Sequence, residues 1–147
     1  MKHRIMIIDG MGGGIGVQLI GRLRDLGDAL ELVALGTNAI ATERMLKAGA
    51  HRGATGENAI RVSVAQGDFI VGPIGIVISN SMMGEITPSM AEAILTARAQ
   101  RILLPLQQDH FALAGLEQAP LAKMIDRAVE MLKDRLPFID RMTTKIV

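Results

Sequence analysis

The sequence predicts an α/β fold of three layers, in which a doubly wound, mainly parallel sheet carries helices on both faces. Three observations lead to this prediction. The first apolar run, Ile5 to Ile8, is continuous rather than alternating, which is typical of a strand buried on both faces. Segments with strand character then alternate with segments of helical periodicity. A glycine cluster, Gly10 to Gly16, joins the first strand to the first helix.

Two strand–helix units account for the first third of the chain. The first strand is followed by a predicted helix over residues 15–26, in which apolar residues recur at helical spacing. Leu30 to Leu35 predicts the second strand. Thr37 or Asn38 can cap the next helix, and Gly49 ends it.

The middle of the chain allows two interpretations. His51 to Thr55 predicts a short third strand and Asn58 to Gln66 a short helix, but the alternation of Ile60, Val62 and Val64 equally suits a strand. Asp68 to Val71 is a further predicted strand. Whether Ile76 to Ile78 continues that strand beyond Pro73 is left open by the sequence.

The last third is predicted to add two helices and one or two strands. Thr87 at the cap and Pro88 at the first helical position open one helix. Ile102 to Leu106 predicts a strand, and Phe111 to Ala114 is a candidate for another. Pro120 opens a long last helix with an apolar stripe of Leu121, Met124, Ile125, Val129, Leu132 and Leu136. The simplest organisation is one domain over residues 1–147.

Polar or glycine-rich turns follow four of the predicted strands. Right-handed crossovers bring the carboxyl ends of parallel strands to one edge of the sheet. Ligands of such sheets bind in the crevice at that edge, where the strand order reverses. We therefore expect these turns to converge on one crevice: Asp9 to Gly16, Gly36 to Asn38, Ala54 to Asn58, and Gly72 to Gly75.

The first turn is the strongest candidate for a binding site. Five glycines in seven positions, with Gly10, Gly14 and Gly16 in the pattern G-x-x-x-G-I-G, allow backbone N–H groups to approach a phosphate. The alternative is a tight turn that binds nothing. The pattern favours a nucleotide, a dinucleotide or another phosphorylated ligand. The predicted binding residues are Asp9, Gly10, Met11, Gly12, Gly13, Gly14, Ile15, Gly16, Thr37, Asn38, Thr55, Gly56, Asn58, Gly72, Pro73, Ile74 and Gly75.

Over residues 4–38 the glycine spacing resembles the signature of the short-chain dehydrogenase and reductase family. The resemblance implies NAD(P) or another nucleotide as the cofactor. However, Gly36-Thr37-Asn38 stands where a ribose-binding acid is expected, so that only Thr37 or Asn38 can hydrogen-bond a sugar. The catalysis of that family depends on a Tyr and Lys pair, and this sequence contains no tyrosine. The family's usual chemistry is therefore excluded.

Nearly the whole chain resembles a family of small bacterial Rossmann-like proteins of uncharacterised function. The resemblance implies a Rossmann-like fold and no activity. Five segments carry it: Asp9-Gly10 with the glycines that follow, Ala34 to Ala39, Gly53 to Ile60, Gly72 to Gly75, and Gly84 to Pro88.

The turns after the later strands also have alternative roles. Thr55 and Asn58 can contact a ribose or phosphate, or can cap the next helix. The backbone of Gly72 to Gly75 can lie under a ring, or can bend only for packing. Met82 and Met83 can adapt to a ligand or partner, or can fill a gap.

Three carboxylates are candidates for acid–base chemistry, namely Asp9, Glu57 and Glu85, although we favour a role for Asp9 in anchoring the glycine turn. We expect His51 near the edge of the crevice and His3 and His110 on the surface. The histidines lack metal-ligand spacing, so that no metal site is predicted. Ser79 and Ser81 lack the context of a nucleophile elbow.

Composition excludes several classes of function. A net charge of +1 and only three aromatic residues, all Phe, argue against nucleic-acid binding. The chain has no cysteine, and no apolar run approaches the roughly 20 residues that cross a bilayer. We expect a cytoplasmic protein that binds a small phosphorylated ligand as a sensor or accessory protein. The alternatives are an enzyme acting on a nucleotide-linked or phosphorylated substrate, and an oligomerisation module without ligand, with a homodimer possible in either case.

Overall fold

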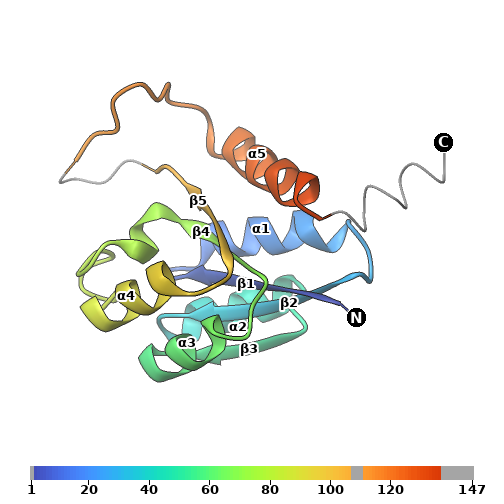
Figure 1. Ribbon diagram of the computed structural model, residues 1–147, viewed down its shortest axis with the longest axis horizontal. Helices are drawn as coiled ribbons and strands as arrows, with labels where there is room; N and C mark the ends of the chain where they lie inside the picture. The colour runs from blue at the N-terminus through green and yellow to red at the C-terminus, as the bar shows by residue number, and fades with distance from the viewer. Residues whose placement is uncertain (1, 107–110, 137–147) are drawn as a thin grey trace.

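A computed structural model of the chain describes residues 2–106 and 111–136. Its five strands form one parallel sheet in the order β3-β2-β1-β4-β5 (Figure 1). The order and direction confirm the predicted doubly wound, Rossmann-like α/β fold. The strands are β1 (His3–Asp9), β2 (Leu30–Gly36), β3 (Arg52–Thr55), β4 (Phe69–Pro73) and β5 (Gln100–Leu104).

Helices cover both faces of this sheet, which gives the three predicted layers (Figure 1). The first layer contains α1 (Gly14–Arg24), α2 (Ala39–Ala48) and α5 (Leu121–Asp134). The other layer contains α3 (Glu57–Val64) and α4 (Pro88–Thr96). A short 3-10 helix, η1 (Ile74–Val77), follows β4 directly.

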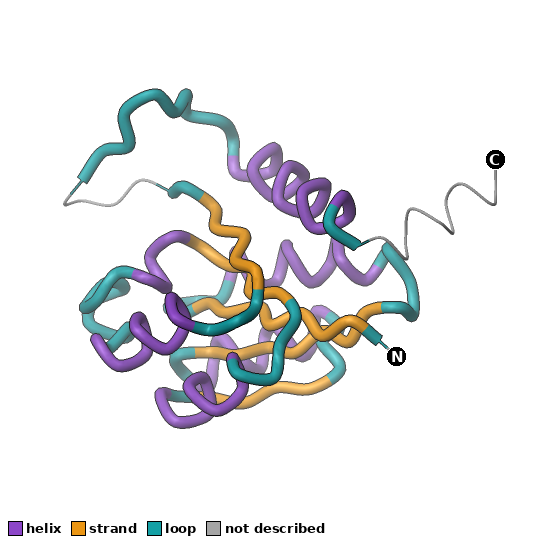
Figure 2. Tube along the Cα trace, viewed as in Figure 1, coloured by secondary structure: helices purple, strands orange, loops and turns teal. Residues whose placement is uncertain are grey.

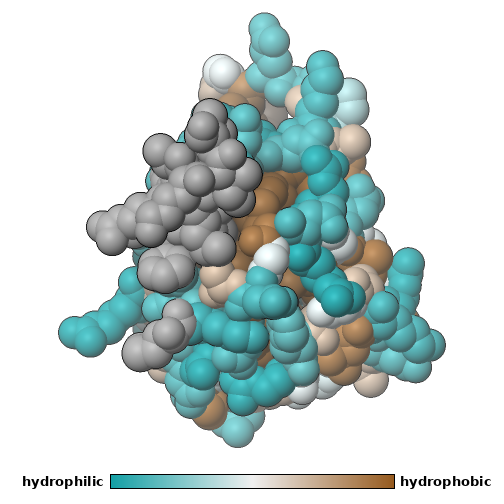
Figure 3. Space-filling view, turned by 90° about the vertical axis from the view of Figure 1, so that its right-hand side faces the viewer, coloured by the Kyte–Doolittle hydropathy of each residue, from teal (hydrophilic) through white to brown (hydrophobic). Residues whose placement is uncertain are grey.

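The central strand β1 is apolar on both sides because each side faces its own core. Ile5 and Ile7 pack in the core beneath α1, α2 and α5. Met6 and Ile8 pack in the opposite core beneath α3 and α4. This explains the continuous apolar run in the sequence. On the face of the molecule seen in Figure 3, hydrophobic side chains lie in a recess between hydrophilic ones.

Two helix caps form as the sequence predicted. Asn38 caps α2, since its Oδ1 accepts a hydrogen bond from the Ala41 N–H at 2.9 Å. Thr87 caps α4 by accepting one from the Met90 N–H at 3.1 Å, and Pro88 is the first helical residue.

The segment after β3, for which the sequence allowed a helix or a strand, forms the helix α3. Ile60 and Val64, four residues apart, are buried, whereas the side chain of Val62 is 54% exposed. Helical spacing therefore determines which residues reach the core. Neither Thr55 nor Asn58 caps this helix, because its cap position is Gly56 and carries no side-chain hydrogen bond.

The structure decides one strand assignment after β4 that the sequence left open and corrects one candidate strand. The backbone beyond Pro73 forms η1, so that β4 does not continue into Ile76 to Ile78. Phe111 to Ala114 does not form a strand either: Phe111 makes an isolated bridge, and the residues after it are exposed. Figure 2 shows residues 112–120 as a loop that stands away from the sheet. His110 and the polar residues before it lie outside the described part of the chain.

Among residues 2–106 and 111–136, we find no helix with both the length and the apolar character needed to span a membrane.

Candidate functional site

The strand order reverses between β1 and β4, and a hollow lies at this point. The chain builds β2 and β3 on one side of β1, then crosses to build β4 and β5 on the other. The hollow has a volume of about 340 Å³. It is lined by Asp9, Gly10, Met11, Gly12, Gly13, Gly14, Ile15, Gln18, Pro73, Met82, Leu106 and Leu121. Its position is the one at which sheets of this kind bind ligands.

The carboxylate of Asp9 holds the glycine turn in place, which is the role favoured from the sequence. Its two oxygens accept hydrogen bonds from the backbone N–H groups of Gly10 and Gly16, each at 2.8 Å. Burial raises the pKa of Asp9, although the amides of Gly16, Gly10 and Ile15 act in the opposite direction. The negative charge of Glu85 adds to the increase.

The middle of the turn keeps backbone donors available. The Gly13 N–H donates to the Gly10 carbonyl at 2.8 Å, and Gly13 has a φ of 73°, which glycine adopts without strain. The N–H groups of Gly12 and Gly14 make no hydrogen bond to any residue within the described ranges. A Cβ placed on Gly14 would meet nothing within 4 Å. The start of α1 is therefore open toward the hollow, as an anion site requires.

A carboxylate from a distant loop occupies the other side of the same turn. Glu85 Oε1 accepts hydrogen bonds from the Met11 N–H at 3.0 Å, from Asn38 Nδ2 at 2.8 Å and from the Thr37 hydroxyl. Burial opposes ionisation of Glu85, but these three hydrogen bonds outweigh it and lower the pKa of the carboxyl group. Arg44 of α2 braces the turn from outside by donating to the Gly12 carbonyl.

The structure brings the turns after β1 and β4 together and keeps the other two away from the hollow. Pro73 lines the hollow with Gly10 to Ile15, while Thr37 and Asn38 contact Glu85 instead. The remaining predicted residues lie outside its lining: Gly16 and Gly72 are buried, Gly75 is buried in η1 beside Ile74, Thr55 donates to Thr42, Gly56 precedes α3, and Asn58 is exposed. Membership of these residues in a ligand site stays a prediction.

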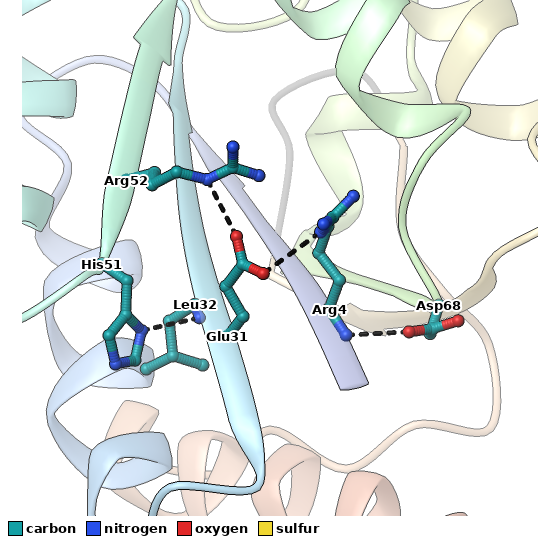
Figure 4. Close-up of polar contacts among 6 residues, drawn as sticks. All are labelled: Arg4, Glu31, Leu32, His51, Arg52 and Asp68. Carbon is teal, nitrogen blue, oxygen red and sulfur yellow. Dashed lines mark hydrogen bonds and ion pairs between the residues drawn. The ribbon is translucent and has the colours of Figure 1, made fainter. Parts of the chain in front are cut away.

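The expected position of His51 near the crevice is wrong. His51 precedes β3, at the opposite end of that strand from the crevice, and its Nδ1 accepts a hydrogen bond from the Leu32 N–H at 2.9 Å (Figure 4). The imidazole thereby pairs with the backbone of β2. Nearby, Arg4 and Arg52 approach Glu31 from the two neighbouring strands at 3.4 and 2.8 Å. This cluster is structural and belongs to the sheet.

The hollow is also lined by four residues outside the predicted binding set, of which only Met82 was considered from the sequence as a residue that can adapt to a ligand. Gln18 follows Gly14 by one helical turn, so that helical spacing alone places it beside the glycine turn. Met82, Leu106 and Leu121 come from segments far apart in the chain, and only the tertiary fold brings them together. These three residues add apolar side chains to the lining of the hollow.

The three candidate carboxylates are all engaged by protein donors. Asp9 and Glu85 accept the hydrogen bonds described above, and Glu57 Oε1 accepts one from the Thr87 hydroxyl at 2.5 Å. Within the described ranges, no group of three or more His, Cys, Asp or Glu side chains is placed to hold a metal ion.

A family model described as "Domain of unknown function (DUF3842)" matches residues 4–137. The chain belongs to this family. Membership in DUF3842 confirms the predicted resemblance to a Rossmann-like family of uncharacterised function. Among solved structures, the chain is similar to a dodecameric FMN-dependent UbiX-like decarboxylase from Escherichia coli O157:H7, with 14% sequence identity and a TM-score of 0.49 over 93% of this chain and 95% of that chain. No curated protein matches the chain.

Proposed function

We propose that this DUF3842 protein binds a small phosphorylated ligand, with a nucleotide as the leading class, in the hollow between the turns after β1 and β4. The observation that carries the proposal is the open start of α1, where the N–H groups of Gly12 and Gly14 have no partner among the described residues. Such donors, together with the positive end of the helix dipole, stabilise a phosphate.

The remainder of the hollow suits an organic group attached to that phosphate. Its volume of about 340 Å³ lies in the range of small-molecule sites, and Ile15, Pro73 and Met82 supply apolar contacts. The neighbouring carboxylates are held by protein donors, so that the proposal is for binding, as a sensor or accessory protein, and assigns no reaction.

A Gly14→Val variant tests this proposal. In the wild-type protein, at least one ligand from AMP, ATP, FMN, NAD, NADP, FAD and sugar nucleotides should raise the melting temperature by about 5–10 °C at a hundred times its dissociation constant. A Cβ at position 14 meets nothing within 4 Å, and Gly14 lines the hollow, so that valine there is expected to fit and to take up space in the hollow beside the free amides. We expect the variant to fold and to lose the shift.

The matched control is Gly21→Val, in the same helix. Gly21 is exposed, and a Cβ on it also meets nothing within 4 Å, so that the two variants place the same side chain on α1. Gly21→Val should retain the ligand-induced shift. An equal shift in both variants, or no shift with any ligand in the wild-type protein, would contradict the proposed site.

A further inference from the structure

The carboxylate of Glu85 reaches across the carboxyl end of the sheet. Glu85 belongs to the loop between η1 and α4, on the β4 side of the molecule. Its acceptor oxygen nevertheless lies at the ends of β1 and β2, within 3.0 Å of the Met11 amide nitrogen and 2.8 Å of Asn38 Nδ2. The Glu85 side chain therefore links the loop after η1 to the turns that follow β1 and β2.

The surroundings are shaped to receive this carboxylate. A Cβ on Gly10 would clash with the Thr37 hydroxyl and would lie 3.0 Å from Glu85 Oε1, so that only glycine leaves room there. Asn38 Nδ2 donates both to Glu85 and to the Met11 carbonyl, at 2.8 and 2.9 Å. Three donors from two separate turns thus meet one oxygen atom.

The loop that carries Glu85 adopts a costly backbone conformation. Asn80, Met82 and Met83 have φ values of 66°, 56° and 57°, in the left-handed region that residues other than glycine rarely adopt. A strained backbone conformation of this kind persists only where contacts with the surrounding structure hold it in place. Here the Asn80 N–H donates to the carbonyl of the buried Ile86 at 2.7 Å, which closes the segment at its base, and the hydrogen bonds of Glu85 hold its C-terminal side.

Glu85 consequently divides the glycine turn into two unequal halves. The amides of Gly12 and Gly14 have no partner among the described residues, and both residues line the hollow together with Pro73 of β4. The Met11 amide, in contrast, already donates to the Glu85 carboxylate, which Thr37 and Asn38 of the turn after β2 also hold. In sheets of this kind, the second nucleoside of a dinucleotide runs to the end of β2. An anionic carboxylate there occupies the space and repels a second phosphate.

We propose that Glu85 is a specificity-determining residue that excludes dinucleotides and confines the site to ligands with a single nucleoside-sized group on the β4 side. This inference rests on the proposed function and deepens it, since it assigns the substrate class by size and charge.

The test compares NAD with its two halves, AMP and nicotinamide mononucleotide, by isothermal titration calorimetry. Glu85→Ala removes both the charge and the bulk, whereas Glu85→Gln keeps an acceptor oxygen and removes only the charge. We expect NAD affinity to rise at least about tenfold in one or both variants, with the affinity for the halves changed less than about threefold. Circular dichroism establishes that each variant is folded.

Glu92→Ala is the matched control, because Glu92 is exposed on α4 and its removal changes net charge equally. It should leave NAD affinity unchanged. NAD affinity within threefold of wild type in both Glu85 variants overturns the inference, as does an equal rise in Glu92→Ala. Failure of the proposed function has a different signature, because it requires that no phosphorylated ligand binds the wild-type protein.

Discussion

The carboxylates of Asp9 and Glu85 accept hydrogen bonds from backbone N–H groups of the same glycine turn, but their surroundings shift their pKa values in opposite directions. Asp9 lies beneath the turn, where burial raises the pKa of its carboxyl group. Glu85 lies beside the turn, and three donors lower the pKa of its carboxyl group despite the cost of burial. The single backbone segment from Gly10 to Gly16 is therefore held by one acid that resists ionisation and by one that favours it.

The Glu85 contribution to stability should depend on pH. Since its pKa is lower in the folded than in the unfolded state, folding favours the ionised form, and the stabilisation is present above the ordinary value of 4.5 and is lost as the pH falls through the folded value. The melting temperature of the wild-type protein relative to Glu85→Gln should therefore be highest near pH 7 and should decrease below pH 4.5. A constant difference from pH 7 to pH 3 would contradict this assignment.

Among the helices and strands, α3 is the element for which local preference and helical periodicity predict different structures. Residues 58–66 contain β-branched residues at alternate positions, which strands favour, yet α3 forms. The helix buries Ile60 and Val64 against Met6, Ile8 and α4, while Val62 remains in solvent. Tertiary contact along one helical face outweighed the local preference for a strand.

Alanine substitutions in α3 distinguish a helix from a strand over these residues. Ile60→Ala should lower the free energy of unfolding by about 2–5 kcal/mol, because it leaves a cavity beneath the sheet. Val62→Ala should change it by less than about 0.5 kcal/mol, because that side chain is 54% exposed. Urea denaturation measures both. Similar losses at the two positions would indicate a strand, in which both side chains share one face.

For the whole molecule, the decisive feature is the close contact between β1 and β4 at the point where the sheet reverses. The hollow lies at this reversal, where residues of the turn after β1 and Pro73 at the end of β4 line it together. A Cβ on Gly72 would clash with the Ile8 carbonyl oxygen, so that glycine at the end of β4 allows the two backbones to approach. A substitution at this contact is therefore expected to disturb the cores on both faces of the sheet and the hollow at its edge.

Gly72→Ala should therefore destabilise the whole fold, by about 1–3 kcal/mol or more, because the added methyl group forces β4 away from β1. Gly21→Ala is the control: that position is open and helical, and alanine there should stabilise by about 0.5–1 kcal/mol. Thermal and urea unfolding of the two variants measure the contrast. Equal stability of Gly72→Ala and the wild-type protein would show that the strands do not need this close approach.

The sequence by itself determined the elements whose signals are local. The continuous apolar run of β1, the helical spacing of α1 and α5, and the caps at Asn38 and Thr87 each depend on neighbours within a few residues. Alternation of these elements was enough to predict the layered parallel sheet and the position of the glycine turn at its edge.

Only the tertiary structure decided how that edge is divided. Nothing in the loop sequence around Glu85 indicates that its carboxylate crosses to Met11 and Asn38, or that Leu106 and Leu121 close the hollow. These contacts join residues that are distant along the chain, and they depend on sheet order and loop path rather than on local propensity. The same reason explains why two of the four predicted turns lie away from the hollow, although all four follow strands at one edge of the sheet.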